Sequence, residues 1–311
     1  MKFKILFLII FASSFSSFRG QTVNDVKPFL PQLFSKFPNV RDLAISNDGN
    51  EMYFTLQSLQ SEFSSILFSK KVNNKWSKPE VASFSGKDKD LEPFLSSDGL
   101  LLYFASNRLK DKNDSIADFD IWYVQRKSLK DKWSEPINMG EPINTIENEF
   151  YPCITKSNNF YFTCDANATK GKDDIFLAKW NNGKYETPVS MTDSINSDGY
   201  EFNAFIAQDE SYMIYTCYNK KGGLGSGDLY ISYNKNGKWT KAKNLREINC
   251  QYMDYCPFVD AQNNLYFTSR RNNVKTEFDK RQTVDELLNE MNKYDNGSSK
   301  LYYVNVLSLL R

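Results

Sequence analysis

Short apolar and aromatic runs alternate with turn sequences along almost the whole chain. In the clearest unit, an apolar run at 93–95 leads through Asp98-Gly99 to an aromatic run at 102–105, and a third run follows at 121–124. Runs rich in β-branched and aromatic residues that are separated by Asp-Gly, Asn-Gly or Asn-Asn predict strands joined by tight turns. Each unit is therefore expected to form an antiparallel meander of three or four short strands.

The meander is repeated. The first two strands of the other copies are expected within 43–55, 152–163, 204–216 and 257–268. A closing phrase built around Lys-Trp or Lys-Tyr ends four copies and recurs every 52 to 57 residues, at 74–79, 131–136, 183–188 and 237–242. Radially repeated four-stranded meanders make a β-propeller. We predict an all-β protein, a β-propeller with five blades, and six blades are the alternative.

The two ends of the repeat differ from its middle. The fifth copy stops at its third strand, at 301–310, without a closing phrase, whereas an extended apolar stretch at 28–34 precedes the first copy. We predict that this stretch supplies the missing outer strand of the fifth blade, which leaves no sheet edge at the seam. An insertion at 272–300 carries a capping box at 283–286, so one short amphipathic helix packed on a loop face is expected there.

The best copy, 90–123, combines several motifs. It reads as an acidic residue, Pro-Phe-Leu-Ser-Ser-Asp-Gly, an aromatic strand, Ser-Asn-Arg and finally Asp-Ile-Trp-Tyr, and another copy carries a glycine-rich loop at 222–227. These motifs resemble the WD-like β-propeller repeat of the TolB type, and the resemblance covers about residues 40–270. It implies the propeller fold without implying an activity, because propellers host binding, scaffolding and catalysis alike.

Composition narrows the chemistry. The 39 basic and 38 acidic residues balance, so no overall field favours nucleic acid. The chain contains no histidine, which excludes Ser-His-Asp and Cys-His catalysis and His-ligated metal sites. Its five cysteines are odd in number and form no close Cys-x-x-Cys pair, so we expect buried free thiols rather than a disulfide framework or a zinc site.

The N-terminus has the layout of a secretory signal peptide. Lys2 and Lys4 precede an apolar run at 5–11 that gives way to Ser and Phe. The run is too short for a stable membrane span, although an uncleaved anchor is the alternative. We predict a signal peptide at 1–20 and a single propeller domain at 21–311, which is periplasmic or secreted and works as a monomer.

A column of carboxylates marks a candidate ligand site. An acid stands three residues before the Pro or Ala expected to open the first strand in four copies, namely Asp90, Glu149, Glu201 and Asp254. First strands are innermost in a propeller, so these acids should converge on one mouth of the central channel. Arg108 and Arg271 follow equivalent second strands and belong to the same face. Either the acids bind a divalent cation or a cationic ligand, or each is paired with a neighbouring group for structural reasons.

A further acidic column, Asp120, Asp174 and Asp228, opens three of the third strands. Because a short carboxylate at such a position accepts hydrogen bonds from loop amides, we interpret this column as structural.

These patterns favour an exported, non-catalytic binding or scaffold module for a protein or a cell-envelope polymer. No cofactor is expected, apart from a divalent cation if one binds at the channel mouth. The alternative is a carbohydrate-active enzyme of the glycoside hydrolase kind, because paired carboxylates cleave glycosidic bonds without histidine. Hydrolysis needs two carboxyl groups in an accessible cleft, so burial and separation of the acids distinguish the two hypotheses.

Overall fold

The structure, a computed structural model, describes residues 26–110, 117–166 and 169–306. The predicted signal peptide at 1–20 lies outside the described residues. Within these ranges, no helix combines the length and the apolar character that a membrane crossing requires.

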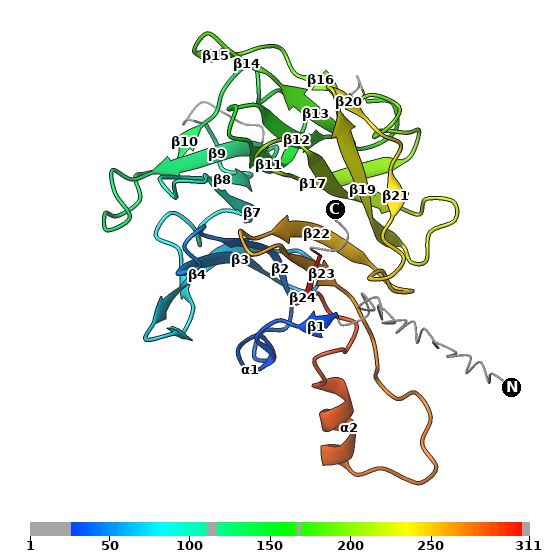
Figure 1. The fold of residues 1–311 in the computed structure, drawn as a ribbon. Coiled ribbons are helices and arrows are strands. Elements are labelled where there is room, and N and C mark those ends of the chain that lie inside the picture. The colour runs from blue at the N-terminus through cyan, green and yellow to red at the C-terminus, as the bar shows by residue number, and fades with distance from the viewer. Residues whose placement is uncertain (1–25, 111–116, 167–168, 307–311) are drawn as a thin grey trace, which may run out of the picture.

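Five antiparallel sheets of four strands form the blades of a β-propeller, which confirms the predicted fold and the count of five (Figure 1). The inner strands contact one another in turn around a closed ring. In order from the channel outward, the blades consist of β2 (Val40–Ile45), β3 (Glu51–Gln57), β4 (Ser64–Val72) and β6 (Glu80–Val81); β7 (Asp90–Leu95), β8 (Leu101–Ser106), β9 (Asp120–Gln125) and β10 (Ile137–Asn138); β11 (Glu149–Ile154), β12 (Phe160–Cys164), β13 (Asp174–Ala178) and β16 (Val189–Ser190); β17 (Tyr200–Ile206), β18 (Tyr212–Tyr218), β19 (Gly227–Lys235) and β21 (Lys243–Asn244); and β22 (Asp254–Val259), β23 (Asn264–Ser269), β24 (Lys300–Asn305) and β1 (Lys27–Pro28).

The closing phrase does not form the outermost strand. It folds back on the third strand as a short hairpin, through β5 (Lys75–Trp76), β20 (Lys238–Trp239) and the separate pair β14 (Trp180–Asn181) and β15 (Lys184–Tyr185). Left-handed residues such as Asn182 and Gly183 make these tight turns, whose twist matches that of a hairpin. The outer strand follows a few residues later.

The N-terminus closes the ring, as predicted. β1 pairs with β24 through Lys27 opposite Tyr303 and Pro28 opposite Tyr302. The prediction that 28–34 is extended throughout is wrong, because α1 (Pro31–Phe34) is a helical turn with Pro31 in its first turn, a position that suits proline. The turn directs Phe34 into the core, where its ring meets that of Phe54 at 4.9 Å.

The insertion in the fifth blade contains the predicted helix, α2 (Val284–Met291). Its capping box is formed, since Thr283 and Glu286 each accept a hydrogen bond from the other's backbone N–H. The expectation that this helix packs on a loop face is wrong. None of its residues is buried, and Figure 1 shows it extending away from the blades.

Aromatic side chains fill the spaces between neighbouring blades. Tyr103 of the second blade meets Phe160 of the third at 5.4 Å between ring centroids, and Phe205 of the fourth meets Phe258 of the fifth at 5.7 Å. All five cysteines are free thiols. Four of them are buried, as expected, whereas Cys250 is partly exposed.

Every inner strand contains a β-bulge. The pairing register with the second strand shifts after its first residues, for example between Leu91 and Phe94. Strand β7 begins at Asp90, so Pro93 does not open it but lies within the bulge, and the same correction applies to Pro152, Ala204 and Pro257. A bulge re-aims the side chains beside it, and here it turns them toward the channel.

Candidate functional site

The two ends of the propeller differ in their connections. We call the end where the inner strands begin the loop face, because there the second strand of each blade leads to the third through the long connections 58–63, 107–119, 165–173, 219–226 and 270–299. The opposite end carries the tight turns between first and second strands, and we call it the turn face. The predicted carboxylate column lies toward the loop face.

The four predicted acids are buried rather than open to solvent. Their exposed fractions are 0% or 1%. Asp90 accepts a hydrogen bond from Arg108 (Nη2–Oδ1 2.5 Å), and Asp254 accepts one from Arg271 (Nη1–Oδ1 3.1 Å). Among the six predicted residues, the structure therefore brings together two acid–arginine pairs, and the two partners of each pair belong to the same blade.

Glu201 and Glu149 have other partners. Glu201 pairs with Lys220 (Nζ–Oε1 2.9 Å), whereas Glu149 accepts hydrogen bonds from the hydroxyl and the backbone N–H of Thr145 (2.6 and 3.2 Å). Burial raises the pKa of Glu149 to about 7, and the bonds from Thr145 oppose that effect only in part. This geometry fits the structural interpretation of the column better than a ligand ring.

Three asparagines that the sequence analysis missed anchor the segments that connect one blade to the next. Asn144, Asn196 and Asn249 each accept a hydrogen bond from a third-strand N–H and donate one to the carbonyl oxygen of the same residue, at 2.9 to 3.1 Å. Each is preceded by isoleucine and stands five residues before an acid of the column. That spacing was a usable signal in the sequence.

Two members of the second acidic column bind loop amides as expected, whereas Asp120 accepts a hydrogen bond from the Asn138 side chain (2.9 Å) and pairs with Lys110 (3.2 Å). Asp174 accepts a hydrogen bond from the Lys170 N–H (2.9 Å), and Asp228 accepts bonds from the Leu224 and Gly225 N–H groups (2.7 and 3.2 Å). The glycine-rich loop thus folds around its own carboxylate.

The bulge residues of all five blades form a second, unpredicted cluster at the propeller axis, which we call the channel cluster. They share a left-handed backbone, with φ between 50° and 61°, which is strained for residues other than glycine. These residues are Asp42, Glu92, Tyr151, Asn203 and Cys256. Backbone N–H groups of three of them reach threonines on the preceding blade, as Glu92 does to Thr55 (3.1 Å).

Arg41 is the cation of the channel cluster. Its guanidinium donates to Asp42 (Nε–Oδ1 2.7 Å) and Glu92 (Nη2–Oε1 2.7 Å) and contacts the Cys256 sulfur at 3.4 Å. Glu92 also accepts bonds from the Tyr151 N–H (2.8 Å) and the Asn203 amide (3.1 Å). Burial raises the pKa of Glu92 to about 7 despite Arg41. Buried charges persist when they are paired in this way.

The channel cluster has the composition of a metal site but is filled by its own cation. Ligand atoms of Asp42, Glu92 and Cys256 lie within 4.8 Å of one another. The Arg41 guanidinium bonds or contacts all three residues and so stands where a metal ion would have to bind. Toward the turn face, the channel narrows to a cavity of about 10 Å³ among prolines and phenylalanines, room for about one water molecule.

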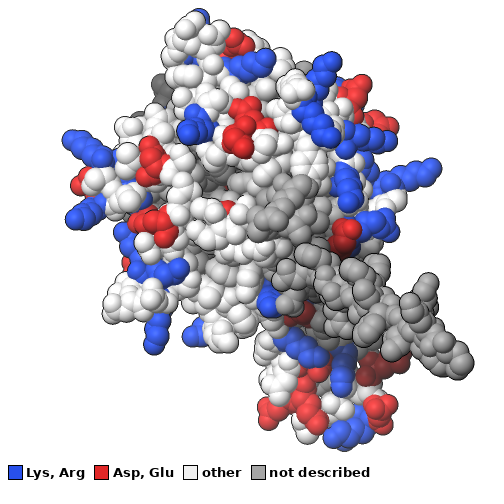
Figure 2. All heavy atoms as spheres, viewed as in Figure 1, with Lys and Arg blue, Asp and Glu red and all other residues white. Residues whose placement is uncertain are grey.

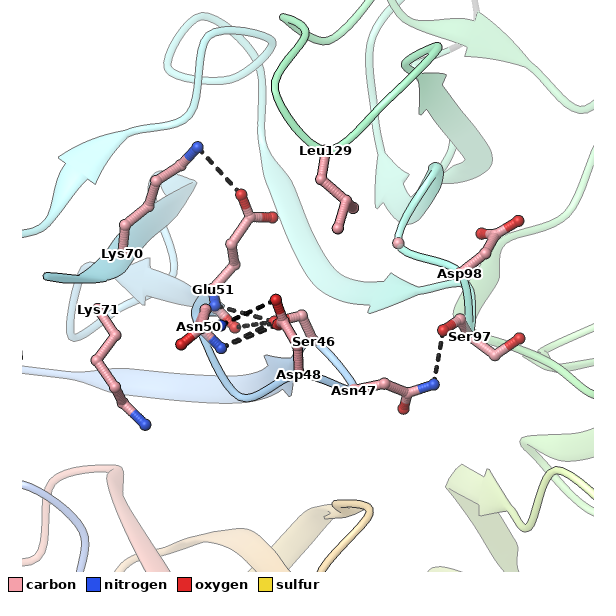
Figure 3. Close-up of a pocket in the computed structure, with 11 residues that line it drawn as sticks. Ser46, Asn47, Asp48, Asn50, Glu51, Lys70, Lys71, Ser97, Asp98 and Leu129 are labelled. Carbon is pink, nitrogen blue, oxygen red and sulfur yellow. Dashed lines mark hydrogen bonds and ion pairs between the residues drawn. The ribbon is translucent and has the colours of Figure 1, made fainter. Parts of the chain in front are cut away.

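A larger hollow lies on the turn face between the first two blades (Figure 3). Its volume is about 380 Å³, and its lining mixes the charges of Asp48, Asp98, Lys70 and Lys71. Glu51 at its edge binds Lys70 (3.1 Å) and the buried Arg126 of the second blade (Nη2–Oε2 2.7 Å). Asp48 and Asp98 accept hydrogen bonds within their own turns, and the lining carries both signs of charge, so the hollow presents no single charge to a ligand.

Exposed apolar side chains gather on the loop face. Among the described residues, seventeen large apolar side chains are exposed, and twelve of them belong to the loops, strand ends and insertion of this face. The twelve are Leu59, Phe63, Leu109, Ile146, Tyr200, Tyr218, Leu224, Phe278, Val284, Leu287, Leu288 and Met291. The loop face therefore exposes more large apolar side chains than the rest of the described surface does.

No protein-family model and no curated protein matches the chain. Among solved structures, hydrazine synthase from Kuenenia stuttgartiensis matches with a TM-score of 0.50 and 10% identity, over 76% of this chain and 36% of that one. A GH43 endo-arabinanase from Bacillus licheniformis matches with a TM-score of 0.49 and 14% identity, over 86% of this chain and 93% of that one. A putative TolB from Agrobacterium tumefaciens matches with a TM-score of 0.47 and 12% identity, over 74% of this chain and 69% of that one. At these identities the similarity concerns the propeller fold alone.

Proposed function

We propose that the protein is an exported, non-catalytic binding module of the WD-like TolB type that recognises a protein partner through its loop face. The observation that carries this proposal is the gathering of exposed apolar side chains on that face. Where such side chains adjoin one another, as on α2, apolar exposure marks interaction sites. Export rests on the N-terminal sequence pattern, and mass spectrometry of the exported protein should find about 20 residues removed.

The burial of the acids favours binding over carbohydrate cleavage. A glycosidase needs two carboxyl groups about 5 to 10 Å apart in a cleft that admits a sugar ring. Here the acids of the column are at most 1% exposed, and those of the channel cluster lie against Arg41. Release of reducing sugar from arabinan by the wild type, with loss in Glu149→Gln, would support the enzyme instead.

Photo-crosslinking with matched positions tests the proposal. Benzoylphenylalanine is placed at Phe63 or Leu224 on the loop face, and at Val72 or Val189 elsewhere; Phe63, Val72 and Val189 are 55%, 58% and 56% exposed. In cells that export the protein, we expect protein adducts from the loop-face positions only. Equal yields from both sets, or adducts confined to Val72 and Val189, would refute this recognition surface.

A further inference from the structure

The insertion of the fifth blade contains the helix α2, whose apolar side faces solvent. Val284, Leu287, Leu288 and Met291 follow the spacing i, i+3, i+4, i+7, and their exposed fractions are 72%, 42%, 46% and 63%. We propose that α2 is a preformed docking helix whose apolar stripe enters an apolar groove, flanked by basic residues, on the partner protein. This inference rests on the proposed function and names the chemistry of its partner.

The arm that carries α2, residues 272–299, is held in shape without a partner. An eight-residue helix is unstable by itself in water, so the capping box and the stem must maintain it. In the stem, the Asn273 N–H and side-chain amide both donate to Asp295 (2.8 Å each), and the Gly297 N–H donates to the Arg271 carbonyl (3.0 Å). A prefolded helix loses less conformational entropy when it binds.

The two described ends of the chain, Val26 and Val306, lie away from the stripe. Val26 adjoins the strand pair Lys27 and Tyr303, and the Val306 N–H bonds the Asn263 carbonyl at 2.9 Å in a turn of the turn face. Both described ends therefore leave from the side of the propeller opposite the loop face.

A second copy of the chain fits the stripe poorly. From the exposed fractions, two stripes packed together would bury about 800 Å² in total, which is the range of crystal contacts and below the roughly 1,200 Å² of stable interfaces. The arm also carries six acidic and four basic residues, so two arms repel each other. A groove that encloses the helix buries more surface than a flat contact does.

The charges beside the stripe select a protein groove over a lipid surface. Asp285, Glu286 and Glu290 lie on α2 itself, whereas the basic residues Lys280 and Lys293 lie outside it and pair with two of these acids. Helices that bind anionic membranes carry Lys and Arg on their polar face. An acidic helix with apolar anchors at this spacing is typical of helix-in-groove recognition.

The test compares two neighbouring positions on α2 in the full chain. Benzoylphenylalanine at Leu288, within the stripe, should form one protein adduct in exporting cells. At Asn289, which is exposed outside the stripe, the yield of that adduct should be at most a tenth as large. The captured protein is then purified and titrated by calorimetry. The Leu287→Ser, Leu288→Ser double variant should bind at least 10-fold more weakly, Asn289→Ser should bind as wild type does, and both should melt as wild type does.

Several outcomes overturn the inference. An adduct of twice the chain's own mass would indicate a second copy of the chain, and cosedimentation with phosphatidylglycerol vesicles that the double variant loses would indicate a membrane. Equal crosslinking at Leu288 and Asn289, no crosslinking at either position, or an unchanged affinity of the double variant would show that the stripe does not bind the partner. The double variant also separates the two proposals. If it still crosslinks from Phe63 and Leu224 as the wild type does, the loop face binds its partner without α2. If the wild type crosslinks from none of these positions, both proposals fail.

Discussion

The channel cluster and the loop face reverse the usual distribution of polar and apolar groups. At the axis, the carboxyl groups of Asp42 and Glu92 are buried and are bonded to Arg41, whose side chain is 15% exposed. On the loop face, apolar side chains such as Leu288 and Met291 stand in water (Figure 2 shows the arm at the lower edge of the view). Buried charges that are already paired have no free hydrogen-bonding capacity for a ligand, whereas the free energy falls when a partner covers exposed apolar groups. The contrast favours recognition over catalysis.

The largest effect is expected from opening the ring around the channel cluster. Deleting residues 21–39 removes β1 and the buried Phe34 and exposes the edge of β24, so it should cost more than about 5 kcal/mol. Since this variant risks not folding, Phe34→Ala is measured beside it by urea unfolding, with an expected loss of about 3 to 5 kcal/mol. The exposed Gln32→Ala is the control, and equal stability of all variants would mean that the seam does not depend on this segment.

The second prediction removes the cation of the channel cluster. Arg41→Ala leaves Asp42 and Glu92 buried without their partner, which should lower the free energy of unfolding by about 3 to 5 kcal/mol. Lys280→Ala breaks an ion pair on the exposed arm and should cost less than about 1 kcal/mol. Thermal and urea unfolding compare the two. Similar small losses would show that the cluster is solvated and that our account of the channel is wrong.

The third prediction concerns pH. Glu149 has a folded-state pKa of about 7, above its ordinary value near 4.5, so between these values the folded protein binds more protons than the unfolded one. Its contribution to stability is therefore present below about pH 4.5 and is lost as the pH rises through 7. Glu149→Gln should be more stable than wild type at pH 8, by about 1 to 3 kcal/mol, with little difference at pH 4.5.

Glu201→Gln provides the control for that measurement. It leaves Lys220 without its carboxylate, so the variant should lose about 1 kcal/mol at pH 8. Loss of stability in both variants at pH 8 would contradict the assignment of a raised pKa to Glu149.

The smallest effect is expected on the arm. Leu288→Asp removes an exposed apolar side chain from α2 and should change the free energy of unfolding by no more than about 0.5 kcal/mol. Equilibrium unfolding in urea measures it. A loss of 2 kcal/mol or more would mean that the stripe packs on the propeller in solution, and the contrast between the two regions would disappear.

The blades, their number and the seam could be predicted because their signals are local. Strand periodicity, turns such as Asn182-Gly183 and the capping box at Thr283 depend on residues a few positions apart, and repetition at 52 to 57 residues multiplies each weak signal. The ring closure followed from a missing strand at one end of the chain and a spare segment at the other. The helical turn in that segment was missed, since Pro31 suits a helix start as well as an extended chain.

The sites depended on contacts between distant blades. Arg41 meets Glu92 and Cys256, 51 and 215 positions away, and the bulges that aim these side chains arise where five inner strands converge on one axis. No local pattern encodes that convergence. The sequence placed Asp90, Glu149, Glu201 and Asp254 three residues before the expected start of the inner strands, whereas they occupy the first or second position of those strands. Only the packed blades decided that these acids are buried and partnered. In the same way, the sequence predicted an amphipathic helix at α2, and only the tertiary structure left its apolar side in water.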